Sequence, residues 1–286
     1  MTIYLHNDGS TLLPQLIAQL PHSLPLALRI QDPLRTESSV LLASFSPGGE
    51  VPEVWTAAFV DQSRKGATNC WPYSSLEASS VGKTTTKEEK SVLEKDILEI
   101  LAYAKAHPPQ IGGLNELIVG SVHDLIAEVL KTKTKLLYCG EWDKYLIHIE
   151  DVPAAFSLPE GYSLGQLRTE EQMERVCNTS TVPRYPRDMW PLRQAALFHQ
   201  GVPISWVFKS LDGSMGALWV EEEHRGKGLG KTLMGLFLRE VGDLVGGWVG
   251  HVDVAPSNEG SRKSVEGVGG KLAWRVWWVN VDLEAF

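Results

Sequence analysis

Residues 218–230 read LWVEEEHRGKGLG, and this stretch decides how the C-terminal half of the chain is interpreted. An apolar run ends at Val220, three glycines follow, and an amphipathic helix is predicted from Leu229 onward. Glycine has no Cβ and adopts positive φ easily, so its backbone can approach an anion closely. The first amides of a helix lack intrahelical partners and carry the positive end of the helix dipole. The stretch therefore predicts a cradle for a pyrophosphate group.

Other phosphate-binding motifs do not fit these residues. A P-loop needs glycine five residues before Gly230, where this chain has Arg225, and Gly82-Lys83-Thr84 fails in the same way. The dinucleotide fingerprint Gly-x-Gly-x-x-Gly fails because Lys231 and Leu233 stand where its last glycine is needed. The pattern that does match is Arg-x-x-Gly-x-Gly.

With its flanks, this run resembles the central motif of the GNAT superfamily of N-acyltransferases. After the next predicted strand, Asn258, Ser261 and Gly269 follow at the family's spacing. The stretch 203–230, together with His251-Val252-Asp253, is similar to the glycine N-acyltransferase-like branch. That branch also places a degenerate GNAT-like domain before the catalytic one. The resemblance is strong over about 200–280, weaker over 160–200, and faint in the N-terminal half.

The resemblance implies an α/β fold class: a mixed α+β sheet flanked by helices, in two tandem GNAT-like domains of which the N-terminal one is degenerate. It also implies acetyl-CoA or another acyl-CoA as co-substrate, and direct attack of an acceptor amine on the thioester in a ternary complex. The residues expected to bind this cofactor are Leu218, Trp219, Val220, Arg225, Gly226, Lys227, Gly228, Leu229, Gly230, Lys231, Asn258 and Ser261.

Amine attack needs a general base, because a protonated amine is not a nucleophile. Glu223 aligns with the acidic residue of the branch, and Glu221 and His251 are the alternative catalytic residues. Glutamates at a strand end can equally be solvated side chains, and a histidine on a strand is often structural. A backbone amide near 218–220 is expected to polarise the thioester carbonyl. Val265 stands where many GNAT proteins have a tyrosine that protonates the leaving thiolate.

Two other functions stay open at this stage. The first is a non-catalytic acyl-CoA-binding protein on the same scaffold, motivated by Val265. The second is a protein or peptide N-acetyltransferase, although the resemblance favours a small-molecule amine or an amino acid as acceptor. Arg184 and Arg187 can bind an acceptor carboxylate or be ordinary loop charges.

Composition narrows the partners. The chain has 286 residues and a formal net charge of −8, which argues against nucleic acid as the main partner. The N-terminus lacks the pattern of a signal peptide, and no apolar run is long enough for a membrane helix, so we expect no membrane partner and a cytoplasmic location. Three widely spaced cysteines fit reduced thiols and predict no metal site. The oligomeric state is not predicted.

The expected organisation is a degenerate α/β domain at 1–150, a proline-containing linker at 151–160 and a catalytic domain at 161–286. A stretch rich in Ser, Thr, Lys and Glu at 63–91 predicts a loop, and an apolar stripe from Leu93 to Ala104 predicts a helix. Thr169 and Gln172 predict a capping box at the start of another helix. Further helices are predicted at 12–20, 115–130, 189–200, 229–244 and 258–268, and strands at 38–45, 54–60, 135–139, 145–149, 162–167, 203–209, 214–220, 248–254 and 271–281.

Overall fold

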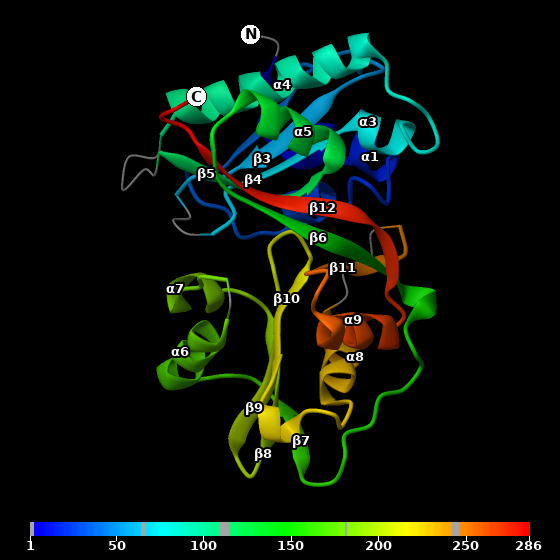
Figure 1. Ribbon diagram of the computed structural model, residues 1–286, viewed down its shortest axis with the longest axis vertical. Helices are drawn as coiled ribbons and strands as arrows, with labels where there is room; N and C mark the ends of the chain where they lie inside the picture. Colours follow the sequence, from blue (N-terminus) through cyan, green and yellow to red (C-terminus); the bar gives the residue numbers. More distant parts are fainter. Residues whose placement is uncertain (1–2, 64–66, 109–114, 181, 242–245) are drawn as a thin grey trace. The chain divides into compact units, whose positions relative to one another are not determined.

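A computed structural model of the chain describes residues 3–63, 67–108, 115–180, 182–241 and 246–286 (Figure 1). The chain forms two compact units. Unit 1 is made of Met1–Glu141 and Arg275–Phe286, and unit 2 is made of Trp142–Trp274.

Unit 1 is built on strands that form an antiparallel meander, β1-β2-β3-β4, followed by β5 and β12. Strand β4 pairs with β5 in parallel at Cys70↔Val119, and β5 pairs with β12 in antiparallel fashion. Its elements are β1 (Tyr4–His6), η1 (Gly9–Thr11), α1 (Leu13–Ile17), α2 (Leu24–Gln31), β2 (Val40–Ala43), β3 (Thr56–Val60), β4 (Cys70–Ser74), α3 (Ser75–Ser79), α4 (Lys87–Ala106), β5 (Glu116–His123), α5 (Asp124–Lys133), the start of β6 (Leu136–His148) and most of β12 (Lys271–Asp282).

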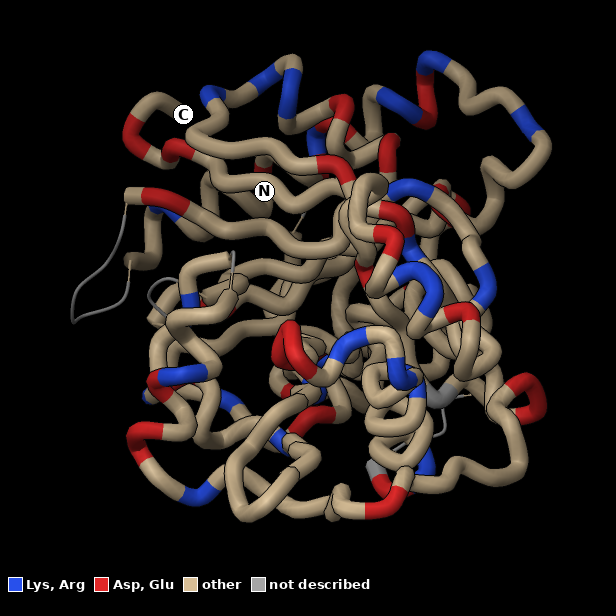
Figure 2. The backbone as a smooth tube through the Cα atoms, turned by 60° about the horizontal axis from the view of Figure 1, so that its bottom comes forward, with Lys and Arg blue, Asp and Glu red and all other residues tan. Residues whose placement is uncertain are grey.

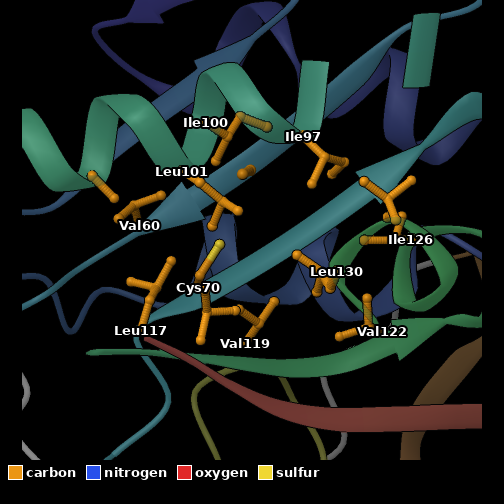
Figure 3. Packing of buried hydrophobic residues seen from close by; sticks show 14 of the residues in the cluster. Val60, Cys70, Ile97, Ile100, Leu101, Leu117, Val119, Val122, Ile126 and Leu130 are labelled. Carbon is orange, nitrogen blue, oxygen red and sulfur yellow. The ribbon is translucent and has the colours of Figure 1, made fainter. Parts of the chain in front are cut away.

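The predicted apolar stripe from Leu93 to Ala104 is confirmed, because its five side chains are buried on one face of α4. Figure 3 shows Ile97, Ile100 and Leu101 pointing from α4 toward strand residues such as Val60. Helix α5 adds Ile126 and Leu130 to the same core. Burial of this apolar cluster stabilises unit 1.

Unit 2 contains an antiparallel sheet in the order β10-β9-β8-β7, and a separate antiparallel pair, β11 with β6. A parallel bridge between Ser214 and His251 joins the start of β10 to β11. Its elements are the end of β6, η2 (Ile149–Asp151), β7 (Tyr162–Gly165), α6 (Glu170–Thr179), α7 (Pro186–Met189), β8 (Gln194–His199), β9 (Val202–Lys209), β10 (Met215–Val220), η3 (Glu222–His224), α8 (Leu229–Val241), β11 (Trp248–Val254), α9 (Glu259–Gly267) and the start of β12.

The two faces of the β10-β9-β8-β7 sheet are covered by different helices. In Figure 1, α6 and α7 lie on one side of β10, and α8 and α9 lie on the other. Side chains alternate between these layers along a strand. Leu218 and Val220 pack toward the core of α8 and α9, whereas Ala217 and Trp219 pack toward the core of α6 and α7. The capping box of Thr169 and Gln172 at the start of α6 is confirmed.

The two units repeat one order of elements: a strand, two helices, a three-strand meander, a long helix, a strand, a helix and a final strand. The final strand of each repeat then pairs in the other unit. Strand β6 closes the first repeat but pairs with β11 of unit 2, and β12 closes the second repeat but pairs with β5 of unit 1. The fold is therefore a mixed α/β arrangement of two tandem domains that exchange their last strands.

Because of this exchange, the boundary between the compact units lies before the predicted linker. The sequence placed the linker at 151–160, whereas the compact units divide after Glu141 and after Trp274. The reason is that residues 143–148 of β6 pair with β11, so they belong to unit 2 although they precede the proline-containing segment.

Three sequence predictions were wrong about the kind of element. Residues 115–130 were expected to be helical, but 116–123 form β5 and the helix begins at Asp124. Residues 189–200 were also expected to be helical, but 194–199 form β8. The predicted loop at 63–91 contains β4 and α3. In the first two cases, a short apolar run fits a buried strand and a helix segment equally well, and only strand pairing decides between them.

The predicted strands at 203–209, 214–220, 248–254 and 271–281 agree with β9, β10, β11 and β12 to within one residue at each end. Leu244, the last position of the predicted helix at 229–244, lies outside the described residues. Figure 2 shows Lys and Arg interspersed with Asp and Glu along much of the described backbone. Among the described helices, none is both long and apolar enough to cross a membrane.

Candidate functional site

Strand β10 departs from regular pairing in its middle. Gly216 pairs with Phe208 and Trp219 pairs with Trp206, so three steps along β10 match two steps along β9. Ala217, inside this bulge, has a φ of 53°, a sparsely populated conformation for a residue with a Cβ. A bulge leaves its extra residue outside the regular ladder and re-aims the backbone. The bulge is therefore the place in β10 where a strand amide can turn toward a ligand.

The glycine loop follows β10 after the short turn η3. Gly226 and Gly228 have φ angles of 76° and 73°, which favour glycine strongly. No atom lies within 4 Å of the position where a Cβ would stand on either residue, so open space borders the loop backbone. Gly230 is different, because its Cβ would lie 3.2 Å from Oγ of Ser264 on α9. The loop thus combines an exposed backbone with close packing against α9.

The N-terminus of α8 is electrostatically suited to an anion. Its first turn contains no acidic residue, and Lys231 lies within it. Arg225 is held in place before the helix: its Nε donates to the Val220 carbonyl at 2.9 Å, and its guanidinium lies 4.9 Å from the Trp219 ring centroid. These two contacts hold the Arg225 guanidinium next to the first residues of the glycine loop.

Asn258 and Ser261 form the start of α9. The Asn258 side-chain oxygen accepts a hydrogen bond from the Ser261 amide at 3.0 Å, which makes Asn258 the N-cap of this helix. The local contact explains why these two residues occur at this spacing. Their predicted contact with the cofactor remains a prediction.

A buried polar cluster lies on β6 and β11. Lys144 Nζ is 2.6 Å from Oδ1 of Asp253 and 3.0 Å from Nδ1 of His251. The other ring nitrogen of His251 is 2.9 Å from the Asp212 carbonyl oxygen. Lys144 and His251 are 1% and 0% exposed. A buried ion pair of this kind needs such hydrogen bonds to offset the cost of desolvation.

His251 is neutral in this cluster. Burial lowers the pKa of its imidazole, and the Lys144 ammonium lowers that pKa further. Lys144 can only donate, so Nδ1 accepts from it and Nε2–H donates to the Asp212 carbonyl. Both ring nitrogens are therefore engaged within the protein. Lys144 was not among the predicted site residues, since an isolated lysine in a strand belongs to no motif.

The three glutamates at the end of β10 have different surroundings. Glu221 forms an ion pair with Arg175 of α6 at 2.8 Å, and Glu222 pairs with Arg225 at 3.3 Å. Glu223 is exposed, and within the described part of the chain it makes neither an ion pair nor a side-chain hydrogen bond. Glu223 is thus the carboxylate of the three that is available to a substrate.

Val265 is fully buried in the core beneath α8 and α9. A Cβ added to Gly270 would lie 2.6 Å from Cγ2 of Val265, so the backbone packs tightly around this side chain. The position is therefore apolar and enclosed, and it offers no hydroxyl to a leaving thiolate.

Arg184 and Arg187 lie near α7 but differ in exposure. The Arg184 guanidinium donates from Nε to Ser180 Oγ at 3.1 Å, and it lies 3.6 Å from the position of a Cβ on Gly216. Burial lowers the pKa of Arg184, and no carboxylate of the described residues forms an ion pair with it. Arg187 is exposed and lies 3.7 Å from the Asp188 carboxylate. Only Arg184 therefore lies beside the bulge.

No group of three or more His, Cys, Asp or Glu side chains among the described residues is placed to hold a metal ion.

The repeated element order, the bulged strand and the glycine loop before α8 define a fold of the GNAT N-acyltransferase class. The family model described as acyl-CoA N-acyltransferase verG N-terminal domain matches residues 1–154, and the chain belongs to this family. A second family model, described as FR47-like protein, matches residues 199–279, which include the bulge and the loop. No curated protein matches the chain at a significant level.

Three solved structures are similar to the chain. An X-ray structure of a Drosophila protein is 12% identical, with 99% of each chain covered and a TM-score of 0.66. A tandem GNAT protein from the clavulanic acid biosynthesis pathway is 14% identical over 98% of this chain and 97% of its own, with a TM-score of 0.49. A GCN5-related N-acetyltransferase from Kribbella flavida is 12% identical over 95% of each chain, with a TM-score of 0.47. The first of these likenesses supports the fold over the whole chain.

Proposed function

We propose that the chain transfers an acyl group from acyl-CoA to the amine of a small molecule or amino acid, as the glycine N-acyltransferase-like branch does. The observation that carries this proposal is the open glycine loop at 225–230 between a bulged strand and a helix N-terminus. The pyrophosphate of CoA would lie against the backbone of Gly226 and Gly228. Lys227 and Lys231 would add positive charge to this site.

The β10 bulge supplies the second requirement of acyl transfer. A thioester carbonyl near Ala217 would accept a hydrogen bond from a strand amide in the range 218–220. This donor would stabilise the oxyanion that forms when the amine attacks. The acceptor would approach from the side of α6 and α7. Arg184 lies there beside Gly216 and can hold an acceptor carboxylate.

Glu223 is the proposed general base. It is exposed and unpaired within the described residues, whereas Glu221 is occupied by Arg175. His251 is less suited, because both of its nitrogens are bonded inside the protein and it is fully buried. With Val265 at the position of the usual tyrosine, solvent would protonate the leaving CoA thiolate.

The test is a matrix of acyl-CoA thioesters against amines, with products identified by mass spectrometry and CoA release measured in parallel. N-acylated product that depends on both partners supports the proposal. CoA binding without product from any amine favours a non-catalytic acyl-CoA-binding protein. Acylation of peptides but not of small amines favours a protein N-acetyltransferase.

A further inference from the structure

Four side chains meet beside the glycine loop, and three of them have no role in the proposed function. They are Tyr162 at the start of β7, His199 at the end of β8, His224 in η3 and Lys227 in the loop itself. The strands place them together: Tyr162 is paired with His199 in the β7–β8 ladder, and η3 follows β10 at the same end of the sheet. We call this group the Tyr162 cluster.

The contacts within the Tyr162 cluster are short and specific. The Tyr162 hydroxyl is 2.9 Å from Nδ1 of His224, and Lys227 Nζ donates to the same hydroxyl at 3.3 Å. The Tyr162 ring lies 5.0 Å from the His199 ring, and the two imidazole rings lie 5.2 Å apart, measured between centroids. These contacts pack the histidine rings against one another and against the tyrosine, which limits their rotamers.

The hydrogen-bond directions leave donors free for a ligand. Because Lys227 donates to the Tyr162 oxygen, the Tyr162 proton is directed to Nδ1 of His224. The proton of neutral His224 then sits on Nε2, which has no protein hydrogen-bond partner among the described residues. The ring nitrogens of His199 have none there either. Lys227 is exposed and keeps further protons for a ligand.

The charge around the cluster favours an anion. Two of the neighbouring carboxylates, Glu221 and Glu222, are each paired with an arginine. Glu223, the third glutamate of this run, precedes His224 in the chain and makes no ion pair within the described residues. Lys227 contributes an ammonium group, and the two imidazoles contribute N–H donors. Several donors of this kind suit a phosphate monoester, which carries close to two negative charges and three acceptor oxygens.

CoA carries such a group, the 3′-phosphate of its ribose, in addition to the pyrophosphate. We propose that the Tyr162 cluster binds this phosphate monoester and thereby distinguishes CoA from nucleotides that lack it. The inference rests on the proposed function, since it requires CoA to bind at the glycine loop. Lys227 would then link the two phosphate sites, with its backbone in the loop and its ammonium in the cluster.

The test compares the affinities for CoA and for 3′-dephospho-CoA, measured by calorimetry on the full chain. The two nucleotides share the pyrophosphate and the adenine, so their affinity ratio isolates the monoester. The wild-type chain is expected to bind CoA about tenfold more tightly or better, as for hydrogen bonds to a charged group. The variants His199→Gln with His224→Gln, and separately Lys227→Met, should reduce this ratio toward one. The double histidine variant should not weaken dephospho-CoA binding by more than about twofold. Lys227→Met also removes positive charge from the pyrophosphate site, so it should weaken the binding of both nucleotides, and that of CoA by the larger factor.

Two further variants keep the test interpretable. Tyr162→Phe removes the hydroxyl that fixes the His224 proton but keeps the ring, so it should lower the ratio with little effect on thermal unfolding. Lys271→Met removes an exposed lysine that pairs with Asp151 and should leave the ratio unchanged. A wild-type ratio near one overturns the inference. So does an equal loss of both affinities in the histidine variant, because that result assigns the cluster to the adenine or the pyrophosphate. If neither nucleotide binds the wild-type chain, the proposed function fails and the inference fails with it.

Discussion

The segment that joins β4 to α4 in unit 1 and the segment that joins β10 to α8 in unit 2 occupy the same place in the repeated element order. At the start of α4, the Thr86 hydroxyl accepts from the Glu89 amide, and the Glu89 carboxylate accepts from the Thr86 amide. Glu88 adds a further negative charge to that first turn. The start of α8 has no acidic residue and follows an open glycine loop. One helix terminus is occupied by its own side chains, and the other is left to a ligand.

The parallel strand contact of each unit also differs in polarity: it is apolar in unit 1 and polar in unit 2. In unit 1 the bridging residues are Cys70 and Val119, both buried in the apolar core, and burial raises the pKa of the Cys70 thiol to about 12. In unit 2 the bridge joins Ser214 to His251, which belongs to the buried cluster with Lys144. The same order of elements therefore places apolar side chains at this strand contact in unit 1 and buried polar side chains in unit 2. The CoA site proposed here belongs to unit 2 alone.

The largest expected effect comes from separating the repeats. A fragment of residues 161–286 lacks the β6 residues that pair with β11, and its β12 lacks the partner β5. We expect this fragment to lose cooperative thermal unfolding, measured by circular dichroism against the whole chain. A fragment that unfolds as cooperatively as the whole chain, and at the same temperature, would show that strand exchange is dispensable.

The next largest effect is expected from the buried ion pair between Lys144 and Asp253 in unit 2. Lys144→Met removes the buried ammonium group that pairs with the Asp253 carboxylate, so we expect a loss of about 3–5 kcal/mol in the free energy of unfolding. The control is Lys263→Met, which removes an exposed pair with Glu259 and should cost no more than about 1 kcal/mol. Both are read from urea unfolding. Equal losses in the two variants would contradict a structural role for the buried polar cluster of unit 2.

A smaller effect, on rate and not on stability, concerns the proposed base. Glu223→Gln should lower kcat/KM by roughly a hundredfold near neutral pH, where a base is needed to deprotonate the ammonium group. The loss should shrink at high pH, where the free amine is abundant. Glu222→Gln, the same substitution at the preceding residue, is the matched control. A wild-type pH–rate profile in the Glu223 variant would move the role to Glu221 or His251.

The smallest expected effect comes from a comparison of two glycines, one in the segment between β4 and α4 and one in the segment between β10 and α8. Gly228 in unit 2 and Gly82 in unit 1 have φ angles of 73° and 71°, and no atom lies within 4 Å of either Cβ position. Valine should therefore strain both backbones similarly. Only Gly228→Val is expected to raise the Kd for CoA, by about tenfold or more, which corresponds to about 1.4 kcal/mol. Unchanged CoA affinity in a folded Gly228→Val protein, or an equal change in Gly82→Val, would remove the loop from the site.

Local sequence determined those parts of the molecule that depend on near neighbours in the chain. The stripe from Leu93 to Ala104 and the capping box at Thr169 act within one helix, so their spacing predicts them directly. The glycine loop at 225–230 was predictable for the same reason, because its positive φ angles and the following helix are properties of a short segment. These features also carried the family resemblance.

Only the tertiary structure decided the features that depend on distant partners. Residues 116–123 and 194–199 became strands because each pairs with a strand on either side, and pairing outweighs a periodicity that fits a helix equally well. Two tandem domains were expected from the family resemblance and not from a repeat of residues, since the repeat lies in the order and pairing of elements. The contact of Lys144 with His251 joins residues 107 positions apart, and the exchange of β6 and β12 brings such pairs together. Contacts of this range depend on which strands lie side by side, and no local pattern of residues specifies that.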